Sequence, residues 1–114
     1  MSFPDKIEEV RVTSLKGLGA SYRLAGTVKI RSNSDNVIQI RYSGVAFGGH
    51  YGGHNVSIQI SPAARKKIIS SLNCTDQDVE NILAEVQRRL LNGEMKVEYD
   101  KLKAEDGNAL GNPI

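Results

Sequence analysis

Apolar and polar residues alternate along the first half of the chain with a period of two residues. This period is typical of β-strands that bury one face and expose the other. It predicts four consecutive strands, around residues 9–13, 22–31, 37–45 and 55–61. The apolar positions that would form the buried face are Val10, Val12, Tyr22, Leu24, Val28, Ile30, Ile38, Ile40, Tyr42, Val56, Ile58 and Ile60.

Two of the links between these strands are short and rich in turn-forming residues. Residues 16–19 and 32–36 are too few to contain a crossover helix, which favours antiparallel pairing of neighbouring strands. A meander is the simplest topology that satisfies these links. Gly26 lies inside the second strand and predicts either a bulge or a point where another group closely approaches the backbone.

After residue 60 the spacing of apolar residues changes to that of helices. Ser61 and Pro62 suit an N-cap and a first helical position, and they predict a helix that ends near Asn73. Thr75 predicts the N-cap of a second helix, and Gly93 predicts its end. The apolar stripe of the second helix consists of Val79, Ile82, Leu83, Val86 and Leu90.

The residues after the second helix predict one more strand and a tail. Met95, Val97 and Tyr99 alternate with polar residues, which favours a short fifth strand, whereas residues 103–114 show no period and predict a flexible tail. Residues 1–102 would then form a single α+β domain in the order ββββααβ. We expect an antiparallel meander sheet of four to five strands with the two consecutive helices packed on one face.

Length and composition restrict the class of protein more than its activity. A chain of 114 residues fits one domain, and 39% hydrophobic with 25% charged residues excludes collagen-like, mucin-like and wholly disordered classes. No run approaches the ~20 apolar residues of a membrane span, and the first residues lack the features of a signal peptide. Together with a single cysteine, Cys74, these features predict a soluble cytoplasmic protein without an internal disulfide.

Positive charge is concentrated in the first half of the chain. Residues 1–60 hold seven Lys and Arg against four Asp and Glu, a net +3, whereas residues 61–114 hold eight against nine, a net −1. On the polar face of the predicted strands, Glu9 is the one acid among five cations, which indicates a positive surface able to attract phosphates or an acidic protein. Simple solvation of an exposed sheet face is the competing explanation. The five cations are Arg11, Arg23, Lys29, Arg31 and Arg41.

A loop predicted over residues 44–55 contains five of the eleven glycines and both histidines. Its two glycine pairs allow positive φ angles and exposed N–H groups, as in anion-binding nests, while histidine and tyrosine side chains offer hydrogen bonds and stacking. A hairpin connection without chemistry is the alternative. The predicted ligand-binding residues are Gly48, Gly49, His50, Tyr51, Gly52, Gly53 and His54, together with Arg23, Arg31 and Arg41.

These features favour a small non-enzymatic binding protein that captures an anionic partner, with a nucleotide or another phosphorylated ligand as the first choice. The alternative is a protein-interaction module, of the inhibitor or immunity type, that docks its basic sheet face on an acidic protein surface. A second alternative is a small phosphodiesterase or nuclease in which His50 and His54 act as base and acid. Nucleic acid is a weakly supported partner, because the strand aromatics Tyr22 and Tyr42 belong to the buried set.

We expect no cofactor, no metal and no membrane contact. His50 and His54 have a spacing that suits zinc on a helix, but glycine pairs disfavour a helix there and no nearby acid or cysteine supplies a third ligand. Cys74 precedes a helix N-terminus, where a thiol pKa can fall, yet its spacing to Val79 indicates a hydrophobic staple. A homo-oligomer is compatible with the open edges of such a sheet.

Overall fold

The strands and helices lie close to the positions that the apolar period predicts. The computed structural model describes residues 3–18, 21–47 and 55–98. A short 3-10 helix, η1, precedes the first strand and has no counterpart among the predicted elements. In chain order the elements are η1 (Phe3–Lys6), β1 (Ile7–Leu18), β2 (Ser21–Arg31), β3 (Val37–Phe47), β4 (Asn55–Gln59), α1 (Pro62–Leu72), α2 (Asp76–Asn92) and β5 (Lys96–Val97).

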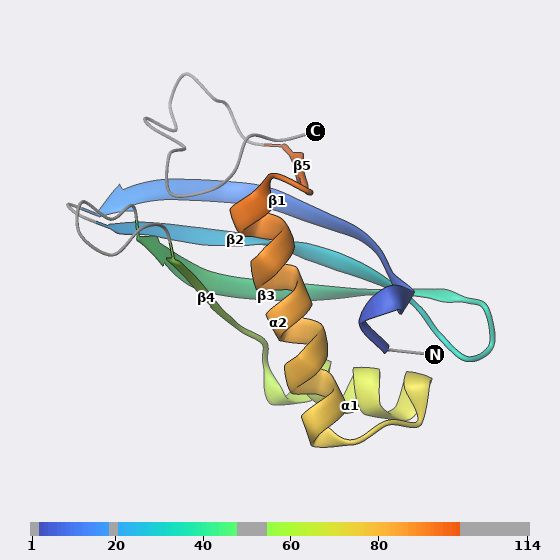
Figure 1. Ribbon diagram of the computed structural model, residues 1–114. Coiled ribbons are helices and arrows are strands. Elements are labelled where there is room, and N and C mark those ends of the chain that lie inside the picture. Colours follow the sequence, from blue (N-terminus) through green and yellow to red (C-terminus); the bar gives the residue numbers. More distant parts are fainter. Residues whose placement is uncertain (1–2, 19–20, 48–54, 99–114) are drawn as a thin grey trace.

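Five strands form one mixed sheet in the order β4-β3-β2-β1-β5 (Figure 1). Consecutive strands from β1 to β4 run antiparallel, as the short links predict. The expectation of a wholly antiparallel sheet is wrong at β5, which pairs with β1 in parallel. Tight turns force neighbouring strands to be antiparallel, but two helices separate β4 from β5 and carry the chain to the opposite edge of the sheet, so either direction is available there.

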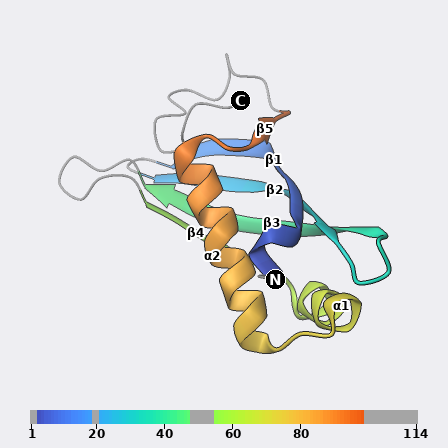
Figure 2. The same ribbon diagram turned by 45° about the vertical axis from the view of Figure 1, so that its right-hand side comes forward.

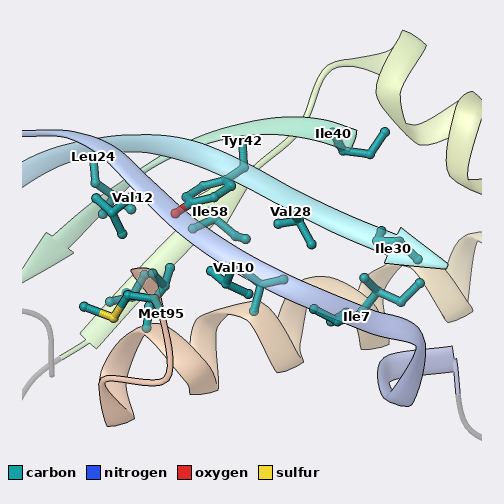
Figure 3. Close-up of a cluster of buried hydrophobic side chains, with 14 of the residues drawn as sticks. Ile7, Val10, Val12, Leu24, Val28, Ile30, Ile40, Tyr42, Ile58 and Met95 are labelled. Atoms are coloured by element: carbon teal, nitrogen blue, oxygen red, sulfur yellow. The ribbon is translucent and has the colours of Figure 1, made fainter. Parts of the chain in front are cut away.

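Helix α2 covers one face of the sheet, and no described helix covers the other face (Figure 2). It contacts β1, β4 and η1, whereas α1 contacts α2 and β3. Figure 3 shows the core between the sheet and α2, with Val10, Val28 and Tyr42 among the side chains that fill it. From α2, the buried side chains are Val79, Ile82, Val86 and Leu90.

A register irregularity in β1 changes which residues face the core. Val10 and Val12 are buried as predicted, but the pairing with β2 shifts between Val12 and Ser14. Leu15 therefore turns toward the core, where it is 6% exposed. Prediction from alternation assumes that every second residue faces the core along the whole strand. It could not show that the core-facing positions shift by one residue at a bulge.

Gly26 faces the core beside the point where β1 changes phase. The Tyr42 hydroxyl, which comes from β3, donates a hydrogen bond of 2.9 Å to the backbone carbonyl of Arg11 in β1. A Cβ atom at position 26 would collide with that carbonyl oxygen and lie 2.5 Å from the Tyr42 hydroxyl. The predicted close approach is confirmed, and the approaching groups are the Arg11 carbonyl and the Tyr42 hydroxyl that is hydrogen-bonded to it.

Both helices begin and end at the residues that their caps predict. Ser61 accepts a hydrogen bond from the Ala64 N–H at 3.1 Å, and Asn73 closes α1 in the left-handed conformation. At the start of α2, Thr75 and Asp78 each accept a hydrogen bond from the backbone N–H of the other, which satisfies two donors that a helix end leaves unpaired. Helix α2 ends at Gly93, as predicted.

Candidate functional site

The sheet face that α2 does not cover is called the open face below. Antiparallel pairing places directly opposed residues on the same side of a sheet, so the register shows which polar side chains are neighbours. Across this face Lys16 lies opposite Arg23, and Glu9 lies opposite Lys29. The polar positions predicted from alternation share this face, but the neighbours of each residue follow only from the register.

Acidic side chains neutralise one end of the open face, near β5. Arg11 contacts Glu9, with Nη2 and Oε1 2.7 Å apart, and it also pairs with Glu98. Lys96 contacts the second oxygen of Glu9 at 3.1 Å. Burial raises the pKa of Glu9, but hydrogen bonds from Lys96 and Arg11 and their positive charges outweigh it, so the pKa lies below its ordinary value.

Arg31, one of the predicted binding residues, also has its charge compensated. Its guanidinium pairs with the carboxylate of Glu8 across β1 and β2. The expected excess of five cations over one acid is therefore too large, because Glu8 and Glu98 join Glu9 on the open face. Sequence alternation missed Glu8 because a second irregularity in β1, between Ile7 and Glu9, departs from regular pairing.

Cations without an ion pair among the described residues also lie on the open face. Lys16 and Arg23 lie opposite each other toward the other end, whereas Arg41 lies opposite Thr27, in the same row as Arg11. No ion pair within the described ranges involves Lys16, Arg23 or Arg41, and all three are exposed. We call these three residues the basic patch. Arg23 lies opposite Val45, and the exposed Phe47 lies two residues further along β3, on the same face. The basic patch thus borders apolar surface.

Two shallow depressions, both open to solvent, flank this arrangement on the described part of the chain. One is formed where β4 leaves β3, and its lining includes Arg41, Ser43 and Gln59. The other lies at the neutralised end, between Glu8, Lys29 and Arg31. Neither encloses a ligand of nucleotide size on most sides, as a typical small-molecule site does.

The predicted loop is shorter than residues 44–55. Positions 44–47 belong to β3 and Asn55 belongs to β4. Gly44 is needed for packing, because a Cβ atom there would collide with the Ser57 carbonyl and lie 2.9 Å from the Ile58 Cα. The remaining predicted residues, Gly48, Gly49, His50, Tyr51, Gly52, Gly53 and His54, lie outside the described residues.

The described residues that flank these positions lie near Arg23. Phe47 pairs with Asn55 on one side and with Ser21 on the other. Ser21 is two residues from Arg23 on the same strand. Phe47 and Asn55, the described residues on either side of positions 48–54, therefore lie at the same end of the sheet as Arg23.

The surroundings of Cys74 favour a packing role for its side chain over a role as a reactive thiol. The thiol is partly buried against the core, and its Sγ atom is 4.0 Å from the Ile68 carbonyl oxygen. Burial raises the pKa of the Cys74 thiol, and the nearby negative charge of Asp78 raises it further. A raised pKa makes the reactive thiolate scarcer at neutral pH.

The described residues show neither a metal-binding cluster nor a membrane-spanning helix. Within residues 3–18, 21–47 and 55–98, no group of three His, Cys, Asp or Glu side chains is placed to hold a metal ion, and no helix is long and apolar enough to cross a membrane. No protein-family model, curated protein or solved structure matches the chain.

An ion-pair cluster at the end of α2 predicts pH-dependent stability. Glu85 accepts hydrogen bonds from Arg88 and Arg89, each 2.8 Å long. The bond from Arg88 is the main cause that lowers the pKa of Glu85 from 4.5 to about 2, against the opposing effect of burial. Because the pKa is lower in the folded state, this stabilisation is complete above pH 4.5 and is lost as the pH falls toward 2.

We expect Glu85→Gln to lower the melting temperature at pH 7, because the neutral amide keeps the shape and loses the charge. The difference from the unmodified protein should shrink below pH 4.5 and vanish near pH 2, where Glu85 itself becomes protonated. Thermal unfolding followed by circular dichroism across this range measures it. A difference independent of pH would show that the carboxylate charge is not what stabilises the cluster.

Proposed function

We propose that this chain is a small non-enzymatic binding protein that captures an acidic protein partner on the open face of its sheet. One observation carries the proposal. The acids of this face neutralise Arg11, Arg31 and Lys96, whereas the three cations of the basic patch are exposed and have no ion pair among the described residues. Lys29 also has no ion pair there, but it is partly buried and lies opposite Glu9. Cations that already form ion pairs with nearby acids contribute to solubility and folding. Cations without an ion pair attract an acidic partner more strongly.

The shape of the open face favours a protein partner over a small molecule. It spans several long strands, and the two depressions that its described residues line are open to solvent. Broad, nearly flat surfaces with arginine and aromatic side chains are typical of protein interfaces, and small-molecule sites are typically concave. Arg23 and Arg41 supply the arginines, and Phe47 supplies the aromatic ring.

Charge reversal in the basic patch tests this function. We expect Arg23→Glu together with Arg41→Glu to abolish capture of the partner protein, because repulsion replaces attraction at the interface. The matched control is Lys66→Glu with Lys67→Glu, which makes the same change in net charge on exposed positions of α1. Partners from the source cells are identified by quantitative mass spectrometry after affinity capture with each variant.

The required result is an individual acidic protein that the unmodified chain and the α1 control both retain, and that the basic-patch variant loses. Its binding is then measured with purified components. Equal retention by all three proteins, with folding of each verified by circular dichroism, would overturn the proposal. The nucleotide version, which depends on residues 48–54, stays a prediction, and a ligand-induced rise in melting temperature across a nucleotide panel tests it separately.

A further inference from the structure

Lys16 and Arg23 place two positive charges directly opposite each other on β1 and β2. Like charges in directly opposed positions of a sheet destabilise it. No described acid forms an ion pair with either residue, although Glu8, Glu9 and Glu98 pair with other cations of the same face. The opposed Lys16 and Arg23 therefore reduce the stability of the sheet, and no ion pair with a described acid offsets this cost.

The position of Lys29 shows the opposite arrangement, in which a cation lies across from an acid. Lys29 lies opposite Glu9 on the same two strands. Opposite charges in directly opposed positions stabilise a sheet. Natural sequences retain unfavourable local contacts mainly where function requires them.

From this contrast we infer that Lys16 and Arg23 together bind a pair of neighbouring carboxylates on an acidic protein surface, with Phe47 contacting an apolar side chain beside them. The inference rests on the proposed function and names the chemistry of its partner. Charge complementarity selects the carboxylates, since two adjacent cations attract two adjacent anions more strongly than one. Phe47 is 46% exposed at the same end of the face, and Arg23 lies opposite Val45.

The stability part of the inference is testable without any partner. Lys16→Glu should raise the melting temperature by about 2–4 °C, because an attractive pair replaces a repulsive one. Arg23→Glu should also raise it, and the double variant should return near the starting value, because two glutamates repel as two cations do. Lys29→Glu is the matched control on the same strands, and it should lower the melting temperature because two acids would then face each other.

The binding part uses defined acidic polymers as probes. Poly-L-glutamate should bind the unmodified protein, and Lys16→Glu should weaken this binding about tenfold at low salt, with the difference shrinking as salt is added. A random copolymer of glutamate and tyrosine should bind more tightly than poly-L-glutamate. Phe47→Ser should remove that excess and leave binding of poly-L-glutamate unchanged.

The two levels of the proposal fail in different ways. The paired-carboxylate inference is wrong if Lys16→Glu and Arg23→Glu both lower the melting temperature. It is also wrong if Lys16→Glu leaves binding of the polymer intact while the double reversal of Arg23 and Arg41 abolishes partner capture. In both cases the docking function stands. If neither acidic polymer binds and no partner depends on the basic patch, the docking function itself is wrong.

Discussion

Replacing Gly26 with alanine is expected to lower the free energy of unfolding by about 3 kcal/mol or more, because overpacking in a core and the loss of a buried hydrogen bond add together. The added Cβ would collide with the Arg11 carbonyl oxygen and lie 2.5 Å from the Tyr42 hydroxyl. Either the tyrosine moves, which breaks its hydrogen bond to Arg11, or β1 moves away from β2. Urea unfolding followed by circular dichroism measures the loss.

Gly17 provides the matched control for this substitution. It also lies in β1, but a Cβ there would meet only the Tyr22 ring, at an ordinary contact distance of 3.9 Å. Gly17→Ala should therefore change stability by less than about 1 kcal/mol. Equal effects of the two substitutions would show that the close approach at Gly26 is not what requires a glycine.

A second substitution separates the backbone obstacle from the side-chain obstacle. Tyr42→Phe removes the hydroxyl that faces position 26 and leaves the Arg11 carbonyl in place. In the Tyr42→Phe background, Gly26→Ala should therefore cost less than it does alone, yet still destabilise the protein clearly. Additivity of the two changes would contradict a shared contact.

Replacing Leu90 with alanine should cost about 3 kcal/mol, because it removes a fully buried side chain and leaves a cavity that the packed surroundings fill only in part. Leu90 is 0% exposed and belongs to the cluster that holds α2 against the sheet. A loss of this size is a large part of the roughly 5–15 kcal/mol that stabilises a typical domain. Urea unfolding again provides the measurement.

Leu91 is the control, since it is the next residue in the same helix turn and only partly buried. The change in helix propensity is the same at both positions, so the difference between the two variants reports burial alone. Leu91→Ala should cost about 1 kcal/mol. Equal losses would contradict the arrangement in which α2 turns Leu90, and not Leu91, fully into the core.

Much of the fold follows from local signals in the sequence. The two-residue period located β1 to β4, and the caps at Ser61, Thr75 and Gly93 located both helices. These signals are local because a strand's buried face repeats every second residue, and because a cap bonds to N–H groups within three residues. The position of Gly26 similarly indicated a close approach, since glycine inside a strand has few other reasons to be retained.

The candidate site was predictable only in part. Arg23 and Arg41 lie on the open face as the alternation predicts, and each is exposed without an ion pair among the described residues. Arg31 follows the same alternation, but its charge is compensated by Glu8. Lys16 was missed because it lies in what the sequence indicated as a turn, whereas β1 continues through it to Leu18.

The features that distinguish one end of the open face from the other come from contacts between distant residues. Arg11 and Glu98, which pair at the neutralised end, are 87 positions apart in the chain, and the partner of Lys16 follows from a register that the irregularities in β1 shift. No local period encodes such contacts, because they depend on which strands become neighbours and in which direction they run. The residue pattern determined which face of each strand is polar, and the tertiary pairing decided which cations on that face form ion pairs among the described residues.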